Sequence, residues 1–356
     1  MKQRNESTNN RPLITFALFA YNQDQFIEKA VNAAFAQTYS PLEIILSDDC
    51  SDDKTFDIMT SMAKVYQGPH SVILNRNTEN LGVGEHVNTI FCLARGDLIV
   101  AAAGDDISAP RRTERTVSRW IESGRPASLS AKVNLIDEAG RAITTKSVYK
   151  KNYTETPECR WQSLLLFAVS GQRNLLGCSS AWSPVLFQRF GPISNAIVNE
   201  DNVLAFRSWL IDRVLFLDDT LVEYRLHGKN LSHQSSFPSQ VLAKVKENEK
   251  RLAESARRKV ACIDQHLEDL RLAHRLGLVD STLVHKVTTA FGARYERLRI
   301  IALWGDLSFA QRIQLLYKAR KEGWRFCFSR FIRLFPPLFF FVRGTASRFW
   351  TSGVIF

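Results

Sequence analysis

The stretch ITFALFAYNQDQFIEKAVNAAFAQTYSPLEIILSDDCSDDKT, residues 14–55, contains a complete strand–helix–strand unit. The run at 13–20 is apolar apart from Thr15, which predicts a short buried strand. After a polar turn, apolar residues recur at helical spacing from Phe26 to Phe35. A second apolar run at 42–46, followed by an acidic loop, predicts another strand and the start of a second helix. The chain therefore opens in the order typical of a parallel sheet.

The same alternation continues further along the chain. The segments 71–75 and 96–104 predict two more strands, with a helix between them through residues 85–94. Strands that alternate with helices of this length are typical of α/β proteins. We therefore expect a mostly parallel, Rossmann-like central sheet with helices on both faces.

The chain of 356 residues is long enough for one large domain and further segments. We predict four parts: a disordered N-terminus at 1–10, an α/β domain at 11–236, a helical C-terminal region at 237–323 and a basic, aromatic tail at 324–356.

Within the predicted α/β domain, residues 127–137 predict a strand and 140–143 its hairpin partner. Residues 199–211 predict a helix with an acidic first turn, and 213–227 predict two strands.

Composition excludes several classes of protein. With 45% hydrophobic and 23% charged residues, the chain is typical of a folded protein rather than a disordered one. Its six cysteines form no CxxC pair and no Cys/His cluster, so neither a zinc finger nor a thioredoxin-type site is supported. The N-terminus lacks the apolar core of a signal peptide, so we expect a cytoplasmic protein.

The net charge of +11 is concentrated near the C-terminus. Residues 318–348 contain eight basic residues and one acid, which favours an anionic membrane surface as partner and not nucleic acid. The uncharged stretch 334–342 is too short to span a bilayer, which needs about 20 residues. We expect peripheral contact with the inner face of the plasma membrane, or packing on the core or on a second copy in a homo-oligomer.

Two pairs of aspartates follow predicted strands. Asp105 and Asp106 end one strand, and Asp48 and Asp49 end another. Adjacent carboxylates at the mouth of a sheet repel each other unless a cation or hydrogen-bond donors neutralise them. Mg²⁺ and Mn²⁺ prefer such oxygen ligands, and substrate phosphates commonly complete the Mg²⁺ shell. The alternative is structural: a solvated turn in which Asp106 caps a helix.

A third acidic group opens the helix expected at 199–211. Acids in a first turn are favoured by the helix dipole, by a few tenths to about 1 kcal/mol, so a structural role is an equal alternative. The segment LGVGEH is not a dinucleotide fingerprint, because Val87 stands where the third glycine would be. Gly82 and Gly84 more simply permit a tight turn and a close approach of the backbone to a ligand.

These segments together resemble the family 2 inverting glycosyltransferases, which have a GT-A-type fold. The similar segments are the stretch at 14–55, NLGVGEHVN, GDLIVAAAGDDISAP, NED at 199–201 and YRLHGKNLS, in the family's order, over about 220 of the 356 residues. The resemblance implies transfer of a sugar from a nucleotide-diphosphate sugar to a saccharide or lipid-linked acceptor, with Mn²⁺ or Mg²⁺ as cofactor, in surface polysaccharide synthesis.

The resemblance also implies roles for single residues. Asp106 would bind the metal, with His227 as a further ligand or phosphate contact. Asp201 would be the general base and Glu200 would orient the acceptor. Asp105 would reach the donor ribose and the metal shell, and Asp49 would read the base. The predicted donor-binding residues are Tyr21, Asn22, Asp48, Asp49, Gly82 and Asp105. Two alternatives stay open: a non-catalytic sugar-nucleotide-binding or membrane-docking protein, and, less favoured, a nucleotidyltransferase.

Overall fold

The computed structural model describes residues 11–144, 159–171, 175–228 and 242–303, with a few single positions up to 314. The predicted disordered N-terminus at 1–10 and the basic tail at 324–356 lie outside the described residues. Two compact units are present, one of Met1–Gln234 with Ala261–Phe291 and one of Ser235–Val260 with Gly292–Phe356. In the part of the chain that is described, no helix has the length and apolar character needed to cross a membrane.

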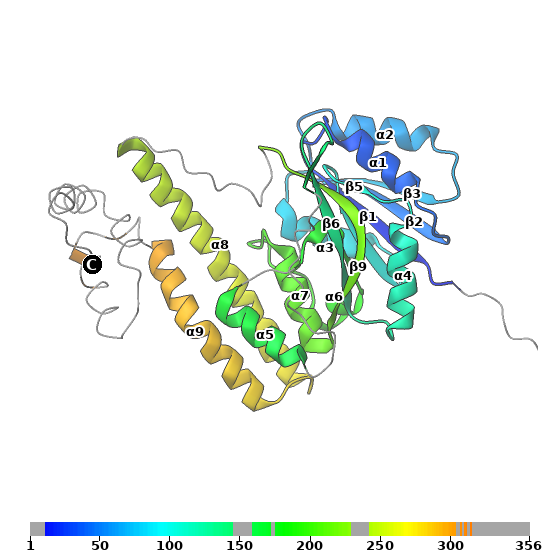
Figure 1. The fold of residues 1–356 in the computed structure, drawn as a ribbon. Coiled ribbons are helices and arrows are strands. Elements are labelled where there is room, and N and C mark those ends of the chain that lie inside the picture. The colour runs from blue at the N-terminus through cyan, green and yellow to red at the C-terminus, as the bar shows by residue number, and fades with distance from the viewer. Residues whose placement is uncertain are drawn as a thin grey trace, which may run out of the picture. The chain divides into compact units, whose positions relative to one another are not determined.

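The first half of the α/β unit alternates strands and helices as predicted (Figure 1). Its strands lie in the order β3-β2-β1-β4, and all three pairings are parallel. The elements are β1 (Ile14–Ala20), α1 (Ile27–Phe35), β2 (Leu42–Asp48), α2 (Thr55–Val65), β3 (Ser71–Arg76), α3 (Gly82–Leu93) and β4 (Leu98–Ala103).

The second half extends the same sheet with β8, β6, β9 and β5 beyond β4. β6 pairs with β9 in parallel, and the short strands β8, β5 and β7 run antiparallel to their neighbours. The elements are β5 (Ile107–Ser108), α4 (Arg112–Glu122), β6 (Ser128–Ile136), β7 (Ala142–Thr144), α5 (Cys159–Ser170), the 3₁₀ helix η1 (Gly177–Ser179), β8 (Ser180–Trp182), α6 (Val185–Phe190), α7 (Glu200–Ile211) and β9 (Val214–Arg225).

The prediction of two strands in 213–227 is wrong. β9 is one strand of 12 residues that passes through Asp218 and Asp219 without a turn. Its register against β6 shifts on either side of Lys132, opposite these two acids. A bulge therefore absorbs the polar pair that the sequence suggested was a break between strands.

Alternate residues of β1 face opposite sides of the sheet. Almost all of them are buried, because helices cover both faces. Phe16 and Leu18 belong to a buried cluster with residues of α1, α2 and α4, whereas Ala17 belongs to a second cluster with Ile90 of α3. The predicted α/β class, with a mostly parallel central sheet between helices, is confirmed. A helical C-terminal region, α8 (Leu242–Arg275) and α9 (Ser281–Leu303), follows as expected, and its residues Ala261–Phe291 group with the first unit.

Candidate active site

The loops that follow β1, β2 and β4 meet at one edge of the sheet. Asp48 is in register with Ala20 at the end of β1, and the Asp49 amide donates to the Ala20 carbonyl at 2.9 Å. On the other side of β1, the Gly104 amide donates to the Phe19 carbonyl at 2.8 Å. Both predicted aspartate pairs therefore leave the carboxyl ends of neighbouring parallel strands, where α/β proteins bind ligands.

The acidic loop after β2 is stabilised by its own side chains. Asp48 is fully buried and accepts from the Ser51 amide at 2.9 Å and from the Ser51 hydroxyl at 2.5 Å. Asn22, in the left-handed conformation, donates its amide to the Ser51 hydroxyl and accepts from the Asp52 amide. These contacts hold the turn after β1 against the loop after β2. Tyr21 beside them is 41% exposed.

Asp49 holds the start of α3. Its carboxylate is buried and accepts from the Asn77 side-chain amide at 2.7 Å, the Leu81 amide at 3.0 Å and the Gly82 amide at 2.9 Å. Gly82 has a φ of 76°, a conformation that favours glycine. Its amide points at a carboxylate of the protein, a structural role that the sequence did not suggest for either residue. Their contact with a nucleotide stays a prediction.

Asp105, Asp106 and His227, the residues predicted to surround the metal, lie near one another. His227 Nε2 is 3.0 Å from Asp105 Oδ2. Asp106 is 4% exposed, and its Oδ1 accepts from the Arg225 amide at 2.9 Å. Its Oδ2 is buried and has no hydrogen-bond partner in the described part of the chain. Burial, and after it the charge of Asp105, raises the pKa of Asp106 to about 8.

This arrangement fits a divalent cation. A buried carboxylate oxygen without a donor is neutralised either by a proton, as the raised pKa of Asp106 indicates, or by a cation that replaces the proton. Among the described residues, no three His, Cys, Asp or Glu side chains are grouped as a complete metal site. An Mg²⁺-like ion bound by one or two carboxylates and by substrate phosphates needs no such cage. Asp106, with Asp105 and His227 beside it, is therefore the part of this edge best suited to hold the ion.

Glu200 and Asp201 form the first turn of α7 next to η1. Asp201 is 6% exposed and accepts from the Asn202 amide at 2.8 Å. Gly177 packs so closely that a Cβ there would lie 2.4 Å from Glu200 Oε1 and 3.8 Å from Asp201 Cβ. The next residue, Cys178, lies against Asp106, and its thiol hydrogen-bonds to the Asp106 carboxylate. Burial, and then the Asp106 charge, raises the pKa of this thiol well above the usual value. One short turn therefore separates the predicted metal ligand from the predicted base.

α3 also contacts the segment that leads to α7. The Gly84 amide donates to the Ile197 carbonyl at 3.1 Å, three residues before Glu200. The start of α3 therefore contacts both Asp49 and the segment that leads to Asp201. A crevice shared by Asp49, Asp106 and Asp201 stays a prediction.

The sequence model of the family described as glycosyl transferase family 2 matches residues 15–170. Residues 15–170 belong to glycosyl transferase family 2. This family 2 domain contains Asp48, Asp49, Asp105 and Asp106, whereas Glu200, Asp201 and His227 follow the matched residues.

Relatives with glycosyltransferase names align over part of their length. An uncharacterized glycosyltransferase of Nostoc is 24% identical over 233 residues, which cover 63% of this chain and 67% of that protein. EpsE of Bacillus subtilis is named as a provisional glycosyltransferase. It is 31% identical over 117 residues, which cover 33% of this chain and 41% of EpsE. The chain thus spans less than half of EpsE and about two thirds of the Nostoc protein.

Among solved structures, Staphylococcus aureus TarS 1–349 in complex with UDP-GlcNAc has a TM-score of 0.47 and 16% identity, covering 81% of this chain and 90% of TarS 1–349. The mannosyltransferase PcManGT of Pyrobaculum calidifontis, in complex with GDP-Man and Mn²⁺, has a TM-score of 0.48 and 14% identity, covering 96% and 88%.

Sequence reasoning missed Arg225, which follows the family 2 domain in the chain and organises that domain's Asp105–Asp106 turn. Arg225 is fully buried at the end of β9. Its Nε donates to the Asp105 carbonyl at 2.8 Å, and its Nη1 donates to the carbonyls of Asp137 and Glu138 at 3.0 and 2.9 Å. A strand pattern alone does not identify a buried arginine. In the sequence, its position two residues before the predicted site residue His227 was the signal that could have pointed to Arg225.

Replacing Arg225 by Met is expected to lower the free energy of unfolding by at least about 2 kcal/mol, because three carbonyl oxygens lose a donor and each unsatisfied group costs about 1–3 kcal/mol. Urea unfolding measures the change. Arg141→Met is the matched control, since Arg141 lies by the same loop but its side chain is 82% exposed. Equal losses in the two variants would contradict the role of Arg225.

A second buried arginine fixes α7, which carries Asp201. Arg207 Nε lies 2.8 Å from Asp269 Oδ2, and both side chains are at most 2% exposed. Arg207 Nη1 also donates to the Gly191 carbonyl at 2.7 Å. Sequence reasoning did not pair two residues that are 62 positions apart. The helix that presents the predicted base is thereby held to the Ala261–Phe291 part of its own unit.

Proposed function

We propose that this protein is an inverting glycosyltransferase that moves a sugar from a nucleotide-diphosphate sugar to an acceptor hydroxyl. One observation carries the proposal: the buried, unpartnered oxygen of Asp106 lies one turn of chain, Gly177–Cys178, away from the carboxylates of Glu200 and Asp201. A cation-binding carboxylate and an acid available as a base are the two groups that this reaction requires.

On the donor side, Asp106 holds Mn²⁺ or Mg²⁺, with Asp105 and His227 next to it. The bound ion supplies positive charge for the diphosphate as it leaves. Asp105 also reaches the donor ribose, and Asp49 with Gly82 lies where the base would bind. The remaining donor-side residues, Tyr21, Asn22 and Asp48, shape the loop around that position.

On the acceptor side, Asp201 removes the proton from the attacking hydroxyl. The acceptor oxygen then bonds to the anomeric carbon from the face opposite the diphosphate, which departs with the bonding electron pair, so the configuration inverts. Asp201 lies in the first turn of α7, where the helix dipole favours a negative charge. Glu200 orients the acceptor.

The setting of the reaction is part of the proposal. A saccharide or lipid-linked acceptor in surface polysaccharide synthesis, at the cytoplasmic face of the membrane, agrees with the resemblance to family 2 and with the basic tail at 324–356.

Incubating the protein with a panel of nucleotide-diphosphate sugars tests the proposal. We expect one donor to release free nucleoside diphosphate in the presence of Mn²⁺, with slower release when the ion is chelated, because the leaving diphosphate needs a counter-charge. The same donor is expected to raise the melting temperature. A donor that stabilises the fold but is never cleaved, with or without acceptor sugars, would instead identify a non-catalytic binding protein.

A further inference from the structure

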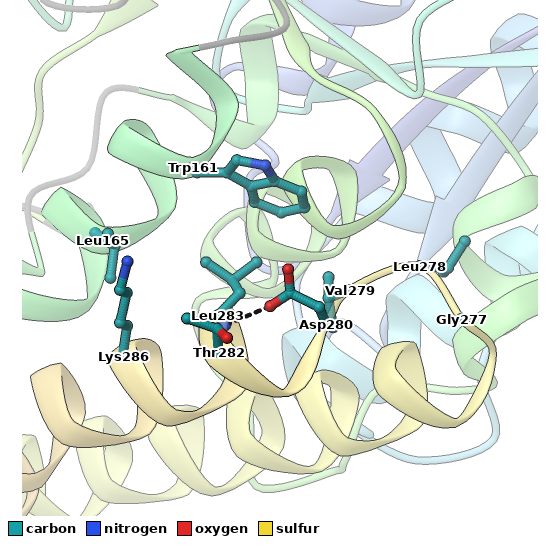
Figure 2. A pocket seen from close by; sticks show the side chains of 9 residues that line it. All are labelled: Trp161, Leu165, Gly277, Leu278, Val279, Asp280, Thr282, Leu283 and Lys286. Atoms are coloured by element: carbon teal, nitrogen blue, oxygen red, sulfur yellow. Dashed lines mark hydrogen bonds between the residues drawn. The ribbon is translucent and has the colours of Figure 1, made fainter.

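Figure 2 shows a pocket of about 310 Å³ whose lining includes none of the predicted site residues. It is formed by α5, by the turn between α8 and α9 and by the first turns of α9, all within the first compact unit. Its lining residues are Trp161, Leu165, Gly277, Leu278, Val279, Asp280, Thr282, Leu283 and Lys286. A volume near the lower end of the usual ligand range, about 300–1,000 Å³, suits one ring-sized group.

The aromatic wall of the pocket is held in place. The guanidinium of Arg160 lies 4.0 Å from the centroid of the Trp161 ring, a cation–π contact. Arg160 itself donates to the carbonyl oxygens of Trp209 and Leu210 near the end of α7. The indole therefore presents a fixed surface that loses little conformational freedom when a ligand binds.

The opposite wall carries polar groups above an apolar floor. Asp280 Oδ1 accepts from the Leu283 amide at 2.7 Å, and Figure 2 shows its other oxygen directed towards the side of the pocket where Trp161 lies. Thr282 and Lys286 are exposed residues of α9, whereas Val279 and Leu283 are only 6% and 8% exposed. The flat indole of Trp161 thus faces a carboxylate, a hydroxyl and an ammonium group, each of which can hydrogen-bond to the hydroxyls of a ligand.

We propose that this pocket is a saccharide-binding subsite that takes one neutral sugar ring. The apolar face of a pyranose stacks on an indole, and its hydroxyls exchange hydrogen bonds with a carboxylate, a hydroxyl and an ammonium group. A phosphate-bearing ligand fits less well, because Asp280 offsets the charge of Lys286. An acyl chain would leave the polar groups of Asp280, Thr282 and Lys286 desolvated without partners.

The subsite binds a part of the acceptor that does not react. Arg160 contacts Leu210, and Asp201 is nine residues earlier on α7, which corresponds to about 14 Å of helix. A sugar in the pocket is therefore several rings away from the attacking hydroxyl. The assignment of the bound sugar to the acceptor rests on the proposed function. Saccharide binding by the pocket does not depend on that function.

Binding is measured on a printed array of neutral mono- to hexasaccharides of glucose, galactose, mannose and N-acetylglucosamine, and by saturation-transfer NMR with the best of them. We expect wild type and Asp201→Asn to bind equally, Trp161→Ala to bind at least tenfold more weakly, and Lys286→Ala at least threefold more weakly. Leu166→Ala is the matched control, since Leu166 is on the same helix, is 44% exposed and does not line the pocket.

Each outcome decides the proposal. Absence of binding by wild type, or equal binding by Trp161→Ala, Lys286→Ala and wild type, overturns it; Lys286 is exposed, so its variant remains informative if Trp161→Ala does not fold. In transfer assays, Trp161→Ala is expected to raise KM at least fivefold for long acceptors and to leave kcat unchanged. Saccharide binding that depends on Trp161 without any transfer would keep the subsite and reject the proposed function.

Discussion

An Asp201→Asn variant is expected to lose sugar transfer by about 10²–10⁴-fold in kcat while its affinity for the donor stays the same. The amide oxygen of Asn can still accept from the Asn202 amide, which Asp201 Oδ1 does at 2.8 Å, so the first turn of α7 is preserved. The amide cannot take a proton from the acceptor hydroxyl. Steady-state kinetics at saturating donor and calorimetric titration of the donor measure the two quantities.

Glu200→Gln is the matched control for Asp201→Asn, because both residues lie in the same helical turn and both substitutions remove one charge. We expect Glu200→Gln to raise KM for the acceptor and to retain most of kcat, since Glu200 orients the acceptor. Unimpaired turnover by Asp201→Asn would remove Asp201 from the role of base, and a larger loss in Glu200→Gln would transfer that role to Glu200.

An Asp106→Asn variant is expected to abolish metal-dependent turnover and to make the metal-free protein more stable. The pKa of Asp106 is raised to about 8, by burial and then by Asp105. A folded-state pKa above the unfolded value of about 4 means that the folded protein keeps a proton that the unfolded chain has released. Stability therefore falls as the pH rises from about 4 to about 8, by up to about 1.4 kcal/mol per pH unit. Asparagine has no charge to bury.

Thermal unfolding between pH 5 and pH 9, with and without Mn²⁺, measures this effect. Wild type is expected to lose stability towards pH 8 and to regain it when Mn²⁺ takes the place of the proton. Asp106→Asn is expected to unfold at a temperature that depends less on pH and not on Mn²⁺. Glu122→Gln, a substitution of a side chain that is 61% exposed, serves as the control. An Mn²⁺ response of normal size in Asp106→Asn would place the cation elsewhere.

The two substitutions also separate the two functions of the edge. Asp201→Asn is expected to keep the Mn²⁺ response that Asp106→Asn loses, because Asp201 does not hold the ion in the proposed mechanism. Loss of that response in both variants would mean that Gly177 and Cys178 couple the two carboxylates more tightly than their separate roles require.

Local pattern was enough to predict the order of the elements and the edge at which the acids gather. The apolar run at 13–20 and the helical spacing from Phe26 to Phe35 are properties of neighbouring residues, and backbone geometry converts such periods directly into strands and helices. Parallel strands then place Asp48, Asp49, Asp105 and Asp106 together, because all their carboxyl ends lie on the same side.

Contacts between distant residues could not be read from the sequence. Arg225 contacts Asp105 across 120 positions, and Arg207 meets Asp269 across 62. Asp49 binds the start of α3, and β9 continues through two aspartates by means of a bulge opposite Lys132. The pocket beside Trp161 likewise needs two helices that are more than 100 residues apart in the chain.

The sequence alone was therefore enough to predict a mostly parallel α/β sheet with acidic loops at the carboxyl edge. These features depend on local periodicity and on the direction of the strands. Only the tertiary structure decided which carboxylate oxygen is buried without a hydrogen-bond donor among the described residues, which acids are already bonded, and which arginines hold them. The reason is physical: a buried polar group takes whichever partner the packing of distant segments brings within hydrogen-bonding distance, and no local pattern specifies that partner.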